Sequence, residues 1–362
     1  MPVESQRRHI HARIADFYHR TARILPWRAP PGANARPDPY HVWLSEVMLQ
    51  QTTVAAVTPY FEKFTRRWPS LADLAAADPA DVLAAWAGLG YYSRARNLIA
   101  CAAAVMADHR GIFPEDLAAL RALPGVGDYT AAAISAFAFG GNAVPLDANV
   151  ERVVARLFAI DTPLPAGRRA ILFVAQSLWP QPGRGELSGG DFAQALMDLG
   201  ARICTARTPD CAACPLGEVC LAHQQGRAAD LPIKPPKRAK PLRHGRALWL
   251  MRDARSPDAA VWLVRRPDKG MLGGMRALPG GDWADMPMPA MNGASMVGTI
   301  RHIFTHFTLD LVVDQVKNPA TIAALTVAEG EWWPITRLDE AGLPTLYRRA
   351  AEIALGATHR GE

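Results

Sequence analysis

The stretch 123-LPGVGDYTAAAISAFAFGGNAVPLDAN-149 decides the fold of the N-terminal part of the chain. It joins a glycine-containing turn to a helix expected to start near Tyr129, and it brings Asp147 to the start of a second helix. Gly125 and Gly127 can both take positive φ, so successive backbone N–H groups can converge beside a helix start, a geometry that suits a phosphate. Two interpretations follow: a DNA-backbone contact beside a carboxylate, or a helix–turn–helix corner in which Asp147 is only an N-cap. The stretch alone favours the corner.

Length and composition indicate two domains. A chain of 362 residues exceeds one typical core, and 49% of its residues are hydrophobic without a run of about 18 apolar residues. The N-terminal segment is basic and lacks an apolar signal region, so we expect a cytoplasmic protein, associated with the nucleoid if bacterial, with no membrane contact. Forty Lys and Arg against 34 Asp and Glu weakly favour a polyanionic partner.

The periodicity and composition of the sequence change near residue 230. Residues 1–230 show helical periodicity without β-like alternation, and an N-terminal helix is expected to reach Leu25. Residues 231–246 contain four prolines, six Lys or Arg and no acid, which predicts a basic linker that either follows DNA phosphates or is simply solvated. Residues 247–362 predict an α+β domain, with strands at 247–251, 260–264 and 307–313 and a closing helix at 346–355.

Four of the five cysteines fall within 17 residues. Cys204, Cys211, Cys214 and Cys220 are close enough in sequence for one loop to surround a single centre, and no export signal supports a disulfide framework. Zinc usually takes two separated Cys-x2-Cys pairs, whereas this uneven spacing suits a [4Fe–4S] cluster and resembles the iron–sulfur loop of helix-hairpin-helix DNA glycosylases. Cys101, on an apolar helix, is expected in the core.

Glu46 lies in the apolar segment 42-VWLSEVMLQQT-52. On a helix its neighbours are Val42, Trp43 and Leu49, and the segment holds no basic partner. Desolvation should raise the pKa of this carboxyl, which makes Glu46 a candidate general acid. A solvated helix face remains the equally weighted alternative.

These features together resemble the MutY family of adenine DNA glycosylases over essentially the full chain. The matching blocks are LPWR (25–28), WLSEVMLQQT (43–52), GLGYYSRARNL (88–98), LPGVGDYTA (123–131), PLDANVERV (145–153), ALMDLGARIC (195–204), the cysteine spacing and FTHF (304–307). The resemblance implies a mainly α helix-hairpin-helix domain with an iron–sulfur loop, a C-terminal Nudix-like domain, and a monomer. It also implies removal of adenine opposite 8-oxoguanine or guanine in double-stranded DNA during base excision repair.

The resemblance assigns roles to the residues of the helical domain. Glu46 corresponds to the acid that protonates the flipped adenine at N7, and Asp147 to the carboxylate that stabilises the sugar cation or transiently bonds to C1′. This division agrees with the chemistry, because breaking an N-glycosidic bond needs a protonated leaving group and an anion near the sugar. The other matching positions hold the catalytic geometry (Tyr129, Asn149), contact the extruded base (Arg28, Gln194) or wedge into the duplex (Gln51, Tyr91).

A related branch of the same fold, the endonuclease III-like glycosylase/lyases, is the nearest alternative. It carries a Lys where this chain has Tyr129, and an amine is needed there for a Schiff base. We therefore expect a monofunctional glycosylase.

The C-terminal domain resembles the Nudix-like reader of 8-oxoguanine. Phe304, Thr305 and His306 match the family's Phe-Ser-His motif, with Thr in place of Ser. No Glu occurs between Gly281 and Ala328, so a Mg²⁺-dependent Nudix hydrolase is not expected.

Ala148 is a second departure, because the family usually has Gly between the catalytic Asp and the Asn. We expect Ala148 in a helical or extended conformation with activity retained. A catalytically impaired damage-binding protein is the alternative that this substitution supports.

Overall fold

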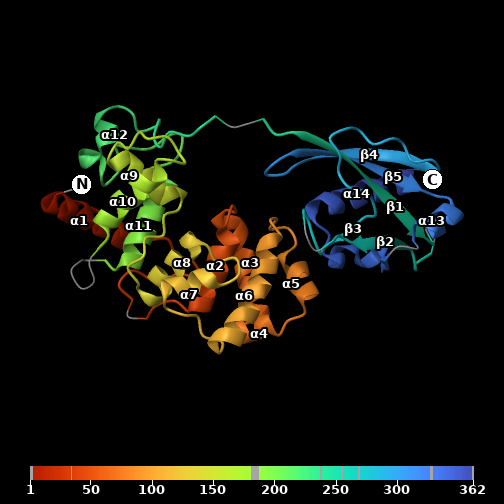
Figure 1. Ribbon diagram of the computed structural model, residues 1–362, viewed down its shortest axis with the longest axis horizontal. Helices are drawn as coiled ribbons and strands as arrows, with labels where there is room; N and C mark the ends of the chain where they lie inside the picture. The colour runs from red at the N-terminus through yellow and green to blue at the C-terminus, as the bar shows by residue number, and fades with distance from the viewer. Residues whose placement is uncertain are drawn as a thin grey trace. The chain divides into compact units, whose positions relative to one another are not determined.

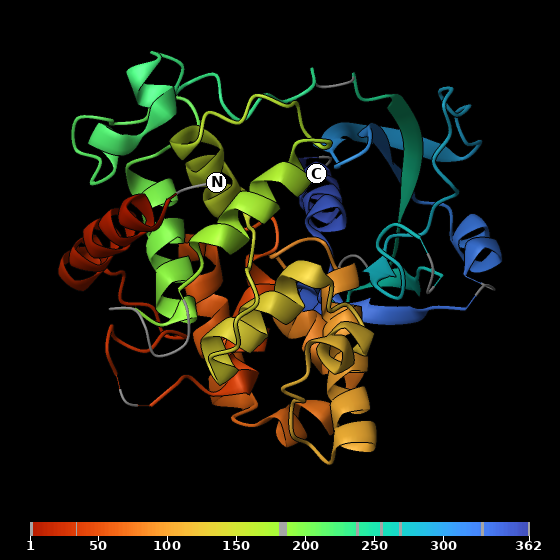
Figure 2. The same ribbon diagram turned by 60° about the vertical axis from the view of Figure 1, so that its left-hand side comes forward.

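The computed structural model describes residues 3–33, 35–180, 187–236, 239–253, 256–267, 270–326 and 329–360. Contacts divide the chain into one unit of Met1–Ala76 with Asn97–Lys237 and a second of Ala77–Arg96 with Arg238–Glu362. Figures 1 and 2 show helices in the first part of the chain and a sheet with helices in the last part, which confirms the expected fold class.

Every regular element described before residue 237 is helical, as the sequence predicts. The elements are α1 (Glu4–Thr21), α2 (Pro39–Leu49), α3 (Val54–Arg67), α4 (Leu71–Ala75), α5 (Pro79–Trp86), α6 (Ser93–His109), α7 (Leu117–Ala122), α8 (Asp128–Ile134) continuing as the π-helical η1 (Ser135–Phe139), α9 (Ala148–Leu157), α10 (Arg168–Leu178), α11 (Gly189–Arg202), η2 (Gly217–Val219) and α12 (Leu221–Gln224).

The N-terminal helix is shorter than predicted. It ends at Thr21 rather than at Leu25, and Ile24 is fully exposed. The prediction was wrong because Ile24 continues the apolar pattern without contacting a core. The loop that replaces the last turn carries Arg23 and Arg28 towards α11.

The glycine turn between α7 and α8 requires only one of its two glycines. Gly125 has φ +73°, and a Cβ there would lie 2.6 Å from Cβ of Asn97. Gly127 instead has φ −90° and ψ −178° as the N-cap of α8, with open space where a Cβ would be. The expectation of positive φ is therefore confirmed at Gly125 and wrong at Gly127, whose extended backbone any residue can adopt.

Helices α9 and α11 pack closely in the first unit. The apolar residues of α9 recur at helical spacing, and Val150, Val153, Val154 and Leu157 are buried. Gly200 on α11 permits the close approach, because a Cβ there would lie 2.7 Å from Cβ of Asn149 and 3.0 Å from its Cα. Figures 1 and 2 show α12 beside α9, so that the cysteine loop lies against the same helix.

The second unit contains a mixed sheet with strand order β3-β2-β1-β5-β4, in which β6 also pairs with β2. Its elements are β1 (Leu242–Arg252), β2 (Ala260–Arg265), β3 (Arg276–Ala277), β4 (Ala294–Ile303), β5 (Thr308–Val316), α13 (Pro319–Leu325), β6 (Glu331–Pro334), η3 (Ile335–Ala341) and α14 (Thr345–Arg360). Strands β1 and β5 are parallel, from Leu242 opposite Thr308 to Leu250 opposite Val316, and the other pairs are antiparallel. Strand β1 begins inside the predicted linker, of which Lys237 and Arg238 lie outside the described residues.

Successive side chains of β1 point to opposite faces of the sheet, and each face packs in a different core cluster. Ala247 and Trp249 belong to a core that includes Leu346 and Ala350 of α14, which packs across β4, β5 and β1 (Figure 1). Leu248 and Leu250 point the other way, into a smaller cluster that Ile322 of α13 covers, together with Trp262 and Val316. Helices α13 and α14 therefore cover opposite faces. No helix among the described residues is long and apolar enough to cross a membrane.

We expect Gly125→Ala to lower the free energy of unfolding by about 1 to 3 kcal/mol, because the substitution combines positive φ with a clash against Asn97. Chemical denaturation followed by circular dichroism measures this loss. The matched control is Gly127→Ala, which has neither problem and should cost less than about 1 kcal/mol. An equal loss at both positions would contradict the assignment.

Candidate active site

Glu46 is a buried carboxyl on α2. The helix begins after Asp38, whose side chain accepts a hydrogen bond from the Tyr40 backbone N–H, and its buried face includes Val42 and Trp43. Glu46 itself is only 7% exposed, which excludes the solvated-face alternative. From α8, the hydroxyl of Tyr129 donates a hydrogen bond of 2.9 Å to its Oε2.

The surroundings of Glu46 favour its protonated form. The pKa of the Glu46 carboxyl is raised to about 7, mainly by burial and also by the negative charge of Asp147. The hydrogen bond from Tyr129 and the positive charge of Arg28 oppose this rise. Since the phenol of Tyr129 is also buried and its pKa lies well above the usual value, it remains a hydrogen-bond donor. Glu46 can therefore hold or release a proton near neutral pH.

Asp147 is the N-cap of α9, as the corner interpretation predicts. Its Oδ1 accepts from the backbone N–H groups of Asn149 at 2.9 Å and Val150 at 2.7 Å, and its Oδ2 accepts from Asn149 Nδ2 at 2.6 Å. Burial raises the pKa of this carboxyl, whereas these hydrogen bonds and the charge of Arg152 lower it. Asp147 is thus a cap and also a neighbour of Glu46. The two interpretations of residues 123–149 are compatible.

Ala148 causes no strain at this corner. It is the first residue of α9 and has a helical conformation, which confirms the expected conformation at this position. Its carbonyl accepts a hydrogen bond of 3.0 Å from Arg152 Nη1. The structure thus gives no support from Ala148 to the impaired-protein alternative.

Arg152 connects the corner to α11 and the cysteine loop. Its guanidinium donates to Asn149 Oδ1 at 2.9 Å, to the Gly200 carbonyl at 2.6 Å and to the Cys204 carbonyl at 2.7 Å. These bonds fix the amide of Asn149, so that its Nδ2 faces Asp147.

The two predicted base-contacting residues are both held by buried partners. Arg28 Nη1 lies 2.9 Å from Asp198 Oδ1 and 3.1 Å from Asp198 Oδ2. Gln194, one helical turn before Asp198 on α11, is buried, and its Oε1 accepts a hydrogen bond of 2.9 Å from the hydroxyl of Tyr18. Neither side chain is the ordinary surface residue that its isolated sequence context indicates.

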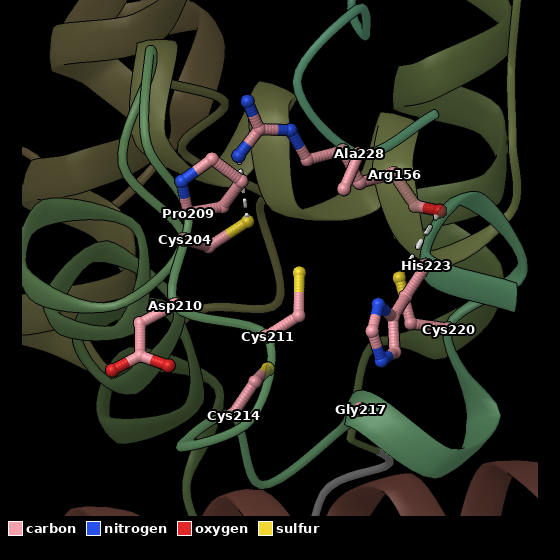
Figure 3. A pocket seen from close by; sticks show the side chains of 10 residues that line it. All are labelled: Arg156, Cys204, Pro209, Asp210, Cys211, Cys214, Gly217, Cys220, His223 and Ala228. Atoms are coloured by element: carbon pink, nitrogen blue, oxygen red, sulfur yellow. Dashed lines mark hydrogen bonds between the residues drawn. The ribbon is translucent and has the colours of Figure 1, made fainter. Parts of the chain in front are cut away.

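The four cysteines of the loop line one hollow of about 270 Å³, including the space open to solvent (Figure 3). The guanidinium of Arg156, almost fully buried on α9, donates to Cys204 Sγ at 3.2 Å and to the Thr205 carbonyl at 2.7 Å. Within the described ranges, no three His, Cys, Asp or Glu side chains form a group suited to a metal ion. Cys101 is buried in the core, as expected.

Gln51 and Tyr91 each have a strained backbone conformation. Their φ values are +58° and +48°, a region that residues with a Cβ rarely adopt. Both side chains are exposed, whereas the neighbouring Tyr92 is buried, so one tyrosine of the pair belongs to the core and the other does not.

The segment between β4 and β5 presents the predicted reader residues. Phe304 stacks on Trp283 with ring centroids 5.2 Å apart and also contacts Phe307. Thr305 and His306 are exposed. The described residues 278–293, which follow β3, contain no helix, so the element that would carry a Nudix metal cluster is missing as well as its glutamates.

Sequence reasoning missed the buried polar residues that support this site: Tyr18, Arg152, Arg156 and Asp198. The buried cation beside Cys204 is Arg156. The available signal was an Arg within the apolar stripe of α9 and an Asp within that of α11, because such charges are rarely buried unless paired.

Comparisons with known proteins place this arrangement in a class. Residues 44–180 match the HhH-GPD superfamily of base excision DNA repair proteins, and residues 251–352 match the NUDIX domain. A thermostable thymine-DNA glycosylase shares 30% identity, with a TM-score of 0.52 over 60% of this chain and 97% of that chain. An endonuclease III in a non-covalent DNA complex, at 23% identity and a TM-score of 0.51, covers 62% of this chain and 99% of its own, and shows the same fold.

The curated relatives are more specific. The adenine DNA glycosylase of Homo sapiens is 32% identical over 88% of this chain and 69% of its own length. That of Mycobacterium tuberculosis (strain ATCC 25618 / H37Rv) is 40% identical over 67% of this chain and 78% of its own. The chain belongs to the adenine DNA glycosylase family.

The raised pKa of Glu46 predicts the pH dependence of a reaction that uses it as an acid. Because the acid must be protonated, the single-turnover rate should be highest below pH 7 and fall as pH rises through about 7. Glu46→Gln, which cannot donate this proton, should lower the rate by about 10²-fold or more while duplex binding persists. The matched control, Glu62→Gln on the exposed face of α3, should leave the profile unchanged. A fully active Glu46→Gln variant would refute the role.

Proposed function

We propose that this protein hydrolyses the N-glycosidic bond of adenine in double-stranded DNA, where the adenine lies opposite 8-oxoguanine or guanine. The observation that carries the proposal is the pair of unlike carboxyls. Glu46 is buried, bonded to Tyr129 and protonatable near neutral pH, while Asp147 accepts three hydrogen bonds beside it. Family membership supports the choice of adenine.

The two carboxyls divide the reaction between the base and the sugar. Glu46 donates its proton to the extruded adenine at N7, which makes the base a better leaving group. As the bond to C1′ breaks, positive charge develops on the sugar, and the carboxylate of Asp147 stabilises it. Water then adds at C1′ and loses a proton, which restores the protonated form of Glu46, leaving free adenine and an abasic site.

The N-cap geometry keeps Asp147 suited to this role. Two backbone N–H groups and the amide of Asn149 donate to its oxygens, which stabilises the ionised carboxyl against the effect of burial. Because the same bonds begin α9, the carboxylate is held by a helix end rather than by a loop.

Arg28 and Gln194 are the residues that we place against the extruded base. Each of them makes a hydrogen bond to a buried side chain, Arg28 to Asp198 and Gln194 to Tyr18. Since Tyr18 donates to Oε1 of Gln194, the Nε2 amide of Gln194 is the end left to donate to a ring nitrogen of the base.

The chain is proposed to be a monofunctional glycosylase. A lyase would need an amine to form a Schiff base at C1′, and the position of that amine carries Tyr129, whose phenol is bonded to Glu46. Lys63 is the only lysine among residues 1–230, and it lies on α3. The lyase alternative thus lacks a nucleophile at this position.

We assign recognition of the duplex to four further residues. Gln51 and Tyr91, exposed on strained backbone, would fill the space left by the flipped base. Thr305 and His306, exposed beside the stacked Phe304, would contact the opposite base, with the Thr hydroxyl in the place of a Ser hydroxyl. We expect the protein to act as a monomer on DNA.

The cysteine loop is proposed to hold a [4Fe–4S] cluster through Cys204, Cys211, Cys214 and Cys220. The four thiols line one hollow, and their uneven spacing in the sequence differs from the two separated Cys-x2-Cys pairs that zinc usually takes. The buried guanidinium of Arg156 donates to Cys204 Sγ, so a positive charge lies beside the thiol ligands of the proposed cluster. Bound, the cluster would cross-link the loop from Cys204 to Cys220.

Single-turnover incubation with a duplex carrying adenine opposite 8-oxoguanine should release free adenine. The strand should remain intact until alkali cleaves the abasic site, because Tyr129 occupies the position at which the lyases carry their amine. A duplex with adenine opposite guanine provides the comparison of opposite bases. Binding without base release at stoichiometric protein would contradict the proposed function, and cleavage without alkali would favour a lyase.

Purified protein should be brown and absorb near ~400 nm, as expected for iron–sulfur ligation by thiolates. Cys214→Ser should weaken or abolish this absorbance, whereas Cys101→Ser, in the core, should retain it. A colourless, zinc-loaded preparation would overturn the cluster assignment.

A further inference from the structure

Asp198 is the most deeply buried charge near the site, and the reaction proposed above does not use it. It lies on α11 with 0% exposure. Its Oδ1 accepts from Arg23 Nε at 2.6 Å, and its Oδ2 accepts from the Arg23 backbone N–H at 3.0 Å. Both oxygens also contact Arg28 Nη1. One carboxylate thus binds two guanidinium groups and the loop that carries them.

Arg28 connects Asp198 to the catalytic acid. Its side chain is only 9% exposed, so water screens its charge poorly. Arg28 acts on Glu46 and favours the ionised form of that carboxyl, which is the wrong form for an acid. The other titratable groups that act on Glu46 are Tyr129 from α8 and Asp147 at the start of α9.

The positive charge of Arg28 therefore opposes the proposed role of Glu46 as an acid. A base-contacting guanidinium beside a general acid favours loss of the acid's proton, unless an anion offsets its charge. Asp198 supplies that anion through its contacts with Arg28 Nη1, and Arg23, which is 25% exposed, is its second partner.

We propose that Asp198 is a positioning residue, which holds Arg28 against the extruded base and offsets its charge so that Glu46 keeps its proton. The proposal rests on the proposed function, because it needs Glu46 to act as an acid. It predicts an electrostatic effect on the reaction in addition to a structural one.

Asp198→Asn keeps the size of the side chain and removes its charge. The single-turnover rate should fall most at neutral and alkaline pH, and the alkaline limb of the pH–rate profile should move to lower pH by about one unit. Asp198→Glu keeps the charge and should restore the limb towards its wild-type position. Tyr18→Phe is the neutral control: it removes the hydrogen bond to Gln194 and should lower the rate without moving the limb.

A second pair of variants tests the same charge without leaving Arg28 unpaired. Arg28→Gln retains Asp198, paired with Arg23, and should move the limb to higher pH because Glu46 loses a neighbouring cation. Arg28→Gln/Asp198→Asn removes both charges and should bring the limb back towards wild type. These two variants decide the question if Asp198→Asn alone does not fold.

An unmoved limb in folded Asp198→Asn, or equal limbs in Arg28→Gln and the double variant, would overturn the inference and leave Asp198 as a purely structural residue. Release of adenine by the wild-type protein separates this failure from failure of the proposed function. If the wild type releases no adenine, the function itself is wrong. If it does, only the role of Asp198 is in question.

Discussion

The removal of the Glu46 carboxyl from water is the constraint on which the site depends. A carboxyl in bulk water would be ionised at neutral pH, whereas burial on α2 leaves Glu46 protonatable near pH 7, even though the hydrogen bond from the Tyr129 hydroxyl favours the ionised form. Every other charge near it must be compatible with that state. The negative charge of Asp147 favours the protonated form, whereas the positive charge of Arg28 opposes it. Arg28 is itself paired with the buried Asp198, the anion that is proposed to offset its charge.

The carboxylate of Asp147 caps helix α9, and the same carboxylate carries the proposed chemical role. An N-cap carboxylate satisfies the free N–H groups at a helix start, and here the same bonds favour its ionised form and hold it in place. The position of α9 then depends on Gly200, whose missing side chain lets α11 approach Asn149, and on Arg152, which joins Asn149 to the carbonyls of Gly200 and Cys204. Rigidity at Asp147 thus comes from the packing of three segments that are distant in sequence.

The second unit keeps the architecture of a hydrolase domain without its metal-binding element. Helices α13 and α14 cover opposite faces of a mixed sheet, but the residues after β3 form no helix where described and carry no glutamate cluster. What this fold presents instead is an aromatic cluster around Phe304, with Thr305 and His306 exposed beside it. Such a surface suits contact with a base rather than hydrolysis of a phosphate.

The sequence by itself determined the helical and α+β parts, the cysteine loop, Glu46 and Asp147, because periodicity, spacing and local apolar context are properties of neighbouring residues. It did not predict β4 or the end of α1, since Ile24 continues an apolar pattern although it contacts no core. Only the tertiary structure decided that Tyr129 bonds to Glu46, that Gly127 is extended, and that Asp198 and Arg156 are buried partners of Arg28 and Cys204. The physical reason is that the pairing of a buried charge depends on groups far away along the chain, which meet only when the helices pack.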